Sequence, residues 1–246
     1  MSPEAIALLT AAALFAGTVD AIAGGGGLVT VPALMFAGLP ADVALATNKG
    51  QSVWGSCAAA ISFWRAGRVD RKLAVIAFPL AFVGGIVGSR LLLEVSSDAL
   101  RPVVIVLLVA AAVVLVVRRP TGTESSERRP TVAMLVALAI GTYDGFFGPG
   151  TGTFLIVCFV TWCGRTLVDA SADAKVVNVG SNLGALVTFI VTGRVAWDVA
   201  LPMAVAQLCG GVLGARFAMA GGARVVRIAV LVVSGALVVR LGWDLL

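Results

Sequence analysis

The chain has 246 residues, of which 59% are hydrophobic and only 13% are charged, and its formal net charge is +5. Ordinary soluble domains carry about a quarter charged residues, so this composition excludes them. The arginines lie in short stretches between apolar runs and form no single basic face, so a nucleic-acid partner is not expected. Apolar runs of about 20 residues can cross the hydrocarbon core as helices, and we predict an all-α integral membrane protein.

The first apolar run extends from Ala5 to Gly38 and contains one charged residue, Asp20. A single helix of that length would measure about 51 Å, which is too long for one upright crossing of the membrane. Four consecutive glycines, Gly24 to Gly27, lie in its middle. We therefore predict that the glycines break this run into two helical pieces.

The remaining segments follow in a regular order. Three helices are predicted in the first half and a polar, proline-flanked linker follows at residues 119–130. A second long run then carries only Asp144, and three further helices follow it. In chain order the predicted segments are Ala44–Phe63, Leu73–Leu93, Ala99–Val117, Thr131–Cys163, Val176–Val191, Ala200–Met219 and Val225–Leu241.

The two halves of the chain repeat one another. At a constant offset of 126, Lys49 corresponds to Lys175, Ser52 to Asn178 and Gly84 to Gly210, and the broken runs align at an offset of 124. We predict two repeats, residues 1–118 and 131–246, each a glycine-broken helix pair followed by three membrane helices. Internal repeats of this kind are typical of secondary transporters.

The distribution of basic residues distinguishes two possible orientations of the repeats. If each broken run crosses once, the halves are parallel and 10 of the 18 basic residues lie in the cytoplasm; if it goes in and returns, the halves are inverted and 13 of 18 do. Because cytoplasmic loops are enriched in Lys and Arg, we predict inverted repeats with a cytoplasmic linker and both termini outside.

Each break frees backbone groups that must find partners in a membrane. Glycines allow a ligand to approach the backbone, and the N-terminal end of the next helix is electropositive, so an anion is the natural occupant. The alternative is a simple kink or a close helix crossing. Asp20 and Asp144 precede the breaks; they are candidates for coupling to an ion, or they hold the break together or neutralise the lysines.

Two related polar faces follow the breaks. Lys175, Asn178 and Asn182 share one helical face, and Lys49, Ser52 and Ser56 repeat it in the first half. These faces predict a cavity wall, and the alternative is that the lysines extend to the membrane interface. The predicted substrate-binding residues are Gly24, Gly25, Gly26, Gly27, Asn48, Lys49, Ser52, Gly148, Gly150, Thr151, Gly152, Lys175, Asn178 and Asn182.

Other sequence features indicate no chemistry. No catalytic triad, phosphate-binding loop or metal-ligand cluster is present, so an enzyme, a cofactor or a bound metal is not expected. The Gly84-xxx-Gly88 and Gly210-xxx-Gly214 pairs indicate helix packing. Gln207 is a lone amide in an apolar segment and a weaker candidate for the site.

The chain resembles the TauE/SafE family of sulfite-exporter-like permeases. The resemblance is carried by GTVDAIAGGGGLVTVPAL, ALATNKGQSV, FWRAGRVD, GTYDGFFGPGTGTF and AKVVNVGSNLGAL, and it extends over essentially the whole chain. It implies transport of a small anion, chiefly sulfite or an organosulfonate, across the bacterial inner membrane.

The leading hypothesis is a multi-pass secondary transporter of the inner membrane that moves such an anion by alternating access. The alternatives are an anion channel and a membrane scaffold subunit that transports nothing. The expected partners are the small anion, the lipid bilayer and a coupling ion, either a proton or sodium, and the chain is compatible with a homodimer.

Overall fold

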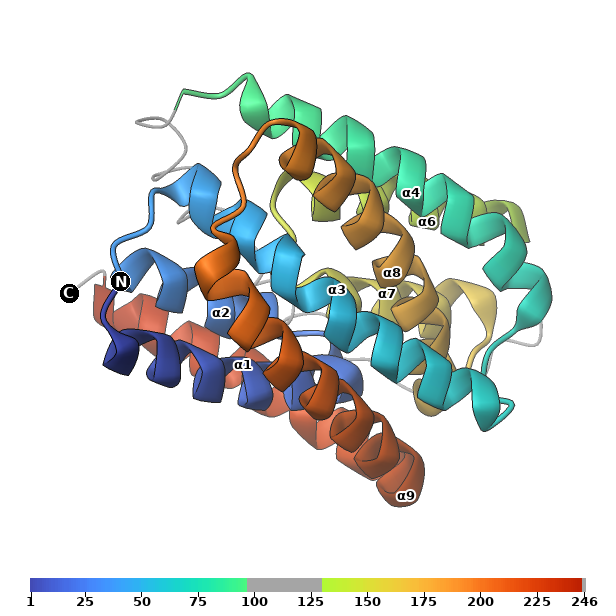
Figure 1. The fold of residues 1–246 in the computed structure, drawn as a ribbon. Helices are drawn as coiled ribbons and strands as arrows, with labels where there is room; N and C mark the ends of the chain where they lie inside the picture. Colours follow the sequence, from blue (N-terminus) through green and yellow to red (C-terminus); the bar gives the residue numbers. More distant parts are fainter. Residues whose placement is uncertain (97–129, 245–246) are drawn as a thin grey trace.

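The computed structural model describes residues 1–96 and 130–244, and this part of the chain is entirely helical (Figure 1). The prediction of an all-α protein is confirmed. The helices are α1 (Pro3–Ala23), α2 (Gly27–Phe36), α3 (Ala41–Arg65), α4 (Arg71–Leu93), α6 (Pro130–Phe146), α7 (Thr151–Cys163), α8 (Leu167–Val191) and α9 (Trp197–Asp244). The predicted segment Ala99–Val117 and almost all of the linker lie outside the described residues.

Both long apolar runs are broken where the glycines predict. The first divides into α1 and α2, and the second into α6 and α7. The short second pieces are 10 and 13 residues long, which is less than the roughly 20 residues that a membrane crossing requires. Neither α2 nor α7 is therefore long enough to cross a membrane by itself.

Two predicted helix boundaries are wrong. Helix α8 begins at Leu167 and not at Val176, because Thr166 caps its first turn by accepting a hydrogen bond from the Asp169 N–H. Residues 167–175, which the prediction left outside the helix, are therefore helical. Helix α9 continues through residues 220–224, where a separation into two segments was predicted, although its ribbon bends and the C-terminal arm runs back in Figure 1.

Helices of one half pack mainly against helices of the other. Helix α1 lies along α9, and α4 lies along α6. Helices α3 and α8 contact each other; α3 also contacts α9, and α8 also contacts α4. In Figure 1, α3 and α8 occupy the middle of the molecule. The two helices that carry most of the buried polar residues thus lie between the others.

Close glycine contacts make this packing possible. A Cβ atom on Gly84 would meet backbone atoms of Leu138 and Thr142 on α6. At the corresponding position of the second half, a Cβ on Gly210 would meet backbone atoms of Leu14 and Thr18 on α1. The glycine pairs therefore serve helix packing, as predicted.

These contacts are reciprocal at the offsets of the sequence repeat, because Leu14 and Thr18 correspond to Leu138 and Thr142. Reciprocal contacts between the halves are what a duplicated chain requires. The duplication and the relative orientation of its halves stay predictions.

The outer surface is apolar. Within the described residues, four helices are long and apolar enough to cross a membrane: Pro3–Ala23, Arg71–Leu93, Leu167–Val191 and the Trp197–Gly221 part of α9. Large apolar side chains such as Leu8, Val75 and Val205 point outward. Helix α3 is not among the four spans, and its polar residues lie inside the bundle. A protein with apolar residues outside and polar residues inside is built for a lipid environment.

Candidate functional site

The two helix breaks touch each other at the centre of the bundle. Helix α1 ends at Gly24, which adopts a left-handed conformation with φ of 78°. A Cβ atom on Gly24 would overlap the backbone of Gly152, and a Cβ on Gly152 would overlap Gly24 in turn. Only glycine at both positions lets the two broken segments approach so closely.

Side chains from the second half bind the carbonyl groups that the first break sets free. Thr153 Oγ1 donates a hydrogen bond to the Ala23 carbonyl at 2.6 Å. Ser171 Oγ lies 3.1 Å from both the Ala21 and the Ile22 carbonyl oxygens. The end of α1 therefore finds its hydrogen-bond partners in the opposite half, as a backbone inside a membrane must.

Each aspartate contacts its own break. Asp20 Oδ1 accepts a hydrogen bond from the Gly26 N–H at 3.2 Å. Asp144 Oδ1 accepts one from the Thr151 hydroxyl at 3.0 Å. The structural role that the sequence left open for the aspartates is therefore present, and it does not exclude a second role.

Each aspartate also forms an ion pair with a lysine of the other half. Lys49 Nζ lies 2.7 Å from Asp144 Oδ1, and Lys175 Nζ lies 2.8 Å from Asp20 Oδ2. The Lys49 and Lys175 side chains are 3% and 0% exposed. The alternative that these lysines extend to the membrane interface is therefore wrong. Both lie in the interior of α3 and α8 and point toward a carboxylate.

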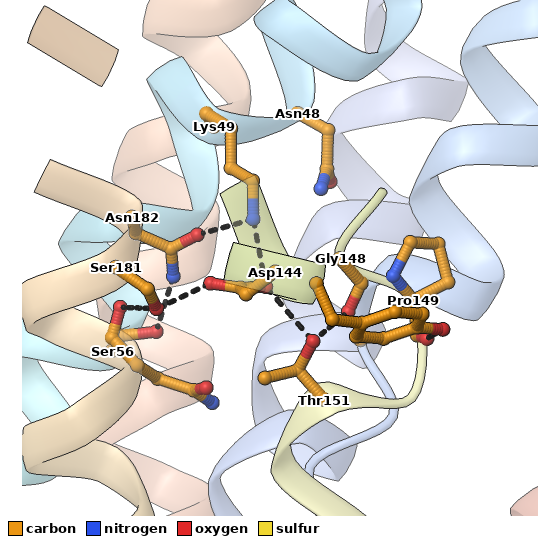
Figure 2. A network of polar contacts seen from close by, with 12 residues as sticks. Asn48, Lys49, Ser56, Asp144, Gly148, Pro149, Thr151, Ser181 and Asn182 are labelled. Carbon is orange, nitrogen blue, oxygen red and sulfur yellow. Dashed lines mark hydrogen bonds and ion pairs between the residues drawn. The ribbon is translucent and has the colours of Figure 1, made fainter. Parts of the chain in front are cut away.

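Figure 2 shows the network around the first of these pairs. Lys49 Nζ also donates to Asn182 Oδ1 at 2.9 Å, and Ser181 Oγ donates to Asp144 Oδ2. Asn182 Nδ2 in turn donates to Ser56 Oγ at 3.4 Å. Helices α3, α6 and α8 are joined through these side chains.

A small cavity of about 20 Å³ lies between the breaks and the two polar faces, which is about the space of one water molecule. It brings together most of the predicted substrate-binding residues and both aspartates. Its lining consists of Asp20, Gly24, Gly26, Gly27, Asn48, Lys49, Ser52, Ser56, Asp144, Gly148, Thr151, Gly152, Asn178, Asn182 and Gln207.

Some predicted residues are not in this lining. Gly25, Gly150 and Lys175 belong to the same region but do not face the cavity. Two residues outside the predicted set, Ser56 and Gln207, do face it. Ser56 lies on the predicted polar face, and Gln207 is a lone amide within an apolar segment, so both carried a signal in the sequence.

Within residues 1–96 and 130–244, two buried polar groups of the lining have no hydrogen-bond partner, namely Ser52 Oγ and Asn178 Oδ1. Asn178 is only 4% exposed. Buried polar groups are normally paired, and each exception calls for an explanation such as a ligand. Ser52 and Asn178 are corresponding positions of the predicted repeat, so each half contributes one free polar group to the cavity.

Two kinds of charge surround the cavity: the lysine–aspartate ion pairs, which have no net charge, and the electropositive N-terminal ends of two helices. The first residues of α2 and α7, Gly27 and Thr151, both line the cavity. The N-terminal end of a helix carries a partial positive charge and free N–H groups. A small anion fits this arrangement. Among the described residues, no group of His, Cys, Asp or Glu side chains is arranged to hold a metal ion.

Residues 9–241 match the family described as Sulfite exporter TauE/SafE. The chain is 37% identical over 247 residues to the Probable membrane transporter protein YfcA of Escherichia coli, and the match covers 99% of this chain and 92% of that protein. It is 38% identical over 239 residues to the Probable membrane transporter protein ORF9 of Sinorhizobium sp, over 96% of this chain and 92% of that protein.

A further relative is a Probable membrane transporter protein of Haemophilus influenzae, which is 32% identical over 244 residues, 98% of this chain and 96% of that protein. No solved structure matches the chain significantly. The similar proteins are named membrane transporters, and none of these names indicates an enzyme.

Proposed function

The chain belongs to the TauE/SafE sulfite exporter family, and on that premise we propose that it is a secondary transporter for a small sulfur-containing anion, either sulfite or an organosulfonate. That it is a membrane transporter and not an enzyme follows from the family and the named relatives. The substrate, its passage by alternating access and a place in the bacterial inner membrane are the proposal.

The observation that carries the proposal is the cavity between the breaks. Two helix N-terminal ends, the Lys49 ammonium and the Ser52 hydroxyl, which has no partner among the described residues, converge on it, and the Asn178 amide lines it. A tetrahedral or pyramidal oxyanion has several acceptor oxygens, which the N–H groups, the ammonium and the hydroxyl can bind.

The cavity supports a transporter that encloses its substrate. At about 20 Å³ it is too small for an organosulfonate, so substrate entry must separate the walls. Because the walls come from both halves, rocking of one half against the other would open the cavity to one side at a time. A channel would instead require a continuous water-filled path.

Counterflow in proteoliposomes tests the proposal. Vesicles loaded with unlabelled sulfite, ethanesulfonate, acetate or methylphosphonate are given labelled sulfite or ethanesulfonate outside. We expect saturable exchange that prefers the sulfur anions. Absence of exchange with both sulfur anions, or equal exchange with the carboxylate and phosphonate, would reject the proposed substrate class, and single-channel currents would indicate a channel.

Asn178→Ala provides a sharper version of the same test. Because the Asn178 Oδ1 has no hydrogen-bond partner among the described residues, its removal breaks none of the hydrogen bonds described in the fold. If the amide binds the anion, half-saturation should require about tenfold more substrate, which corresponds to about 1.4 kcal/mol. Thr142→Ala is the matched control, because Thr142 bonds only within its own helix.

A further inference from the structure

We infer that the Lys49–Asp144 pair couples each transported anion to one proton, with Asp144 as the proton carrier. The inference rests on the proposed function, because it concerns how an anion enters the same cavity. It assigns different roles to the two aspartates, which the sequence treats as equivalent.

The charges at the cavity already cancel. Lys49 is neutralised by Asp144 and Lys175 by Asp20, through ion pairs of 2.7 and 2.8 Å. An anion that enters without a companion would leave one uncompensated negative charge in a buried site, which is strongly unfavourable in a low-dielectric interior. Entry of one proton with the anion restores neutrality.

Lys49 is placed to exchange a carboxylate for an anion. An ammonium group has three donors, and those of Lys49 contact Asp144 and Asn182. A Cβ atom on Gly148 would lie 2.8 Å from Lys49 Nζ, so the broken backbone runs directly beside the ammonium. Once Asp144 is protonated, Lys49 keeps Asn182 as a neutral partner and its charge becomes available to an anion at the break.

The surroundings of Asp144 accommodate both of its protonation states. The groups that face it are the Lys49 ammonium from α3, the Ser181 hydroxyl from α8 and the Thr151 hydroxyl from α7, with Asp20 across the cavity. A hydroxyl can rotate from donor to acceptor. Ser181 or Thr151 can therefore donate to the carboxylate and accept from the protonated acid.

Asp20 lacks these properties. One of its oxygens accepts from the Gly26 backbone N–H, which cannot become an acceptor, and the other binds Lys175. Lys175 does not line the cavity. Protonation of Asp20 would therefore leave an unpaired lysine that an anion in the cavity does not reach, and the Asp20–Lys175 pair is assigned to holding the first break against α8.

Coupling follows by linkage. Protonated Asp144 favours anion binding at Lys49, and a bound anion favours protonation of Asp144 by the same factor, because coupling between two sites is reciprocal. The pair thus makes one proton and one anion travel together, in whichever direction the gradients drive them.

Proton movement per transported anion tests the inference. Proteoliposomes containing a trapped pH indicator receive an inward gradient of labelled ethanesulfonate. This anion is the conjugate base of a strong acid and therefore binds no proton at neutral pH. Any proton that accompanies it must therefore be carried by the protein. The wild-type protein should move about one proton per sulfonate, and Asp198→Asn, at an exposed position in the first turn of α9, should leave this ratio unchanged.

The two aspartate variants separate the two assignments. Asp144→Asn, which mimics the protonated acid, should still exchange labelled for unlabelled sulfonate, but its net sulfonate uptake down the gradient should have a proton ratio near zero. Asp20→Asn should keep a ratio near one, even where its rate falls. A ratio near one for Asp144→Asn, or near zero for Asp20→Asn, would overturn the assignment.

The remaining outcomes are also decisive. Net sulfonate uptake by the wild-type protein without proton movement rejects the coupling and leaves the proposed function standing, whereas no exchange of sulfite or ethanesulfonate rejects the proposed function itself. If Asp144→Asn does not fold, the double variant Lys49→Gln/Asp144→Asn leaves no buried charge unpaired. It should then lose sulfonate-driven proton movement, and persistence of that movement would reject the inference.

Discussion

Lys49 and Asp144 form an ion pair between side chains that are 3% and 4% exposed. Removing two charges from water is costly, and their mutual attraction offsets that cost only when further hydrogen bonds satisfy the remaining donors and acceptors. Here Asn182, Ser181 and Thr151 supply those bonds. The pair is therefore stable as a complete network and vulnerable to loss of either member.

The first prediction concerns Lys49→Gln. This change leaves the Asp144 carboxylate buried without its cation, and breaking a buried pair costs about 3–5 kcal/mol. We expect a clear drop in the thermal unfolding midpoint of the detergent-solubilised protein at pH 8. Asp144→Asn added to Lys49→Gln should recover most of that loss, because neither charge then remains.

Arg68→Gln is the matched control for this prediction. Arg68 pairs with Asp169 at 3.6 Å on the surface, where its side chain is 50% exposed, and such pairs contribute about 0–1 kcal/mol. Equal midpoints for Lys49→Gln and Arg68→Gln would contradict the view that burial makes the first pair important.

At the scale of secondary structure, the important feature is a pair of helices, α1 and α6, that end at the glycine breaks inside the bundle. The end of α1 exposes carbonyl groups that have no partner in their own helix. Thr153 from α7 and Ser171 from α8 donate to them. The break in one half is therefore stabilised by side chains of the other, so the two halves must fold together.

The second prediction is that Thr153→Val destabilises the protein by about 1–3 kcal/mol, because it leaves the Ala23 carbonyl buried and unpaired. Valine has nearly the shape of threonine, so the effect isolates the hydroxyl. Thermal unfolding in detergent measures it.

Thr142→Val serves as the control for Thr153→Val. The Thr142 hydroxyl donates to the Leu138 carbonyl one turn earlier in α6, so its loss removes only a bond within one helix. An equal effect of the two variants would show that the cross-half hydrogen bond has no special role.

At the scale of the whole molecule, helices of the two halves are interleaved. Helix α1 packs on α9 and α6 on α4, and the glycines at these contacts correspond at the repeat offset. Inverted repeats would place the N-terminus and the linker at residues 119–130 on opposite sides of the membrane, whereas parallel repeats would place them on the same side.

The third prediction tests this topology with single cysteines. In a variant with the four native cysteines replaced, Ser2→Cys should react with a membrane-impermeant maleimide added outside intact cells. Ser125→Cys should react only after permeabilisation, because the basic linker is expected in the cytoplasm.

Arg68→Cys controls the labelling, because both arrangements place the loop after α3 in the cytoplasm. It should be protected in intact cells and labelled after permeabilisation. Labelling of Ser2→Cys and Ser125→Cys under the same conditions would reject the inverted arrangement.

Much of the fold follows from local sequence. Apolar length predicts the membrane helices, and the glycines of the Ala5–Gly38 run predict the break between α1 and α2, because neither depends on distant residues. The predicted start of α8 at Val176 leaves out the polar residues Asp169, Ser171 and Asp173, which lie in its first turns. These polar residues are helical because Thr166 caps the helix and because partners elsewhere in the fold, such as the Asp70 N–H for Asp173 and the Ala21 carbonyl for Ser171, accommodate them.

Part of the candidate site likewise follows from local sequence, and part of it follows only from the tertiary structure. The sequence by itself determined which polar residues lie in the membrane, because a charged or amide side chain in an apolar run is conspicuous. Only the tertiary structure decided their partners: Lys49 meets Asp144 and Lys175 meets Asp20, each across the two halves, and Lys175 does not face the cavity while Gln207 does. The physical reason is that an ion pair depends on distance in space, here between α3 and α6 and between α8 and α1, and local sequence does not contain these distances.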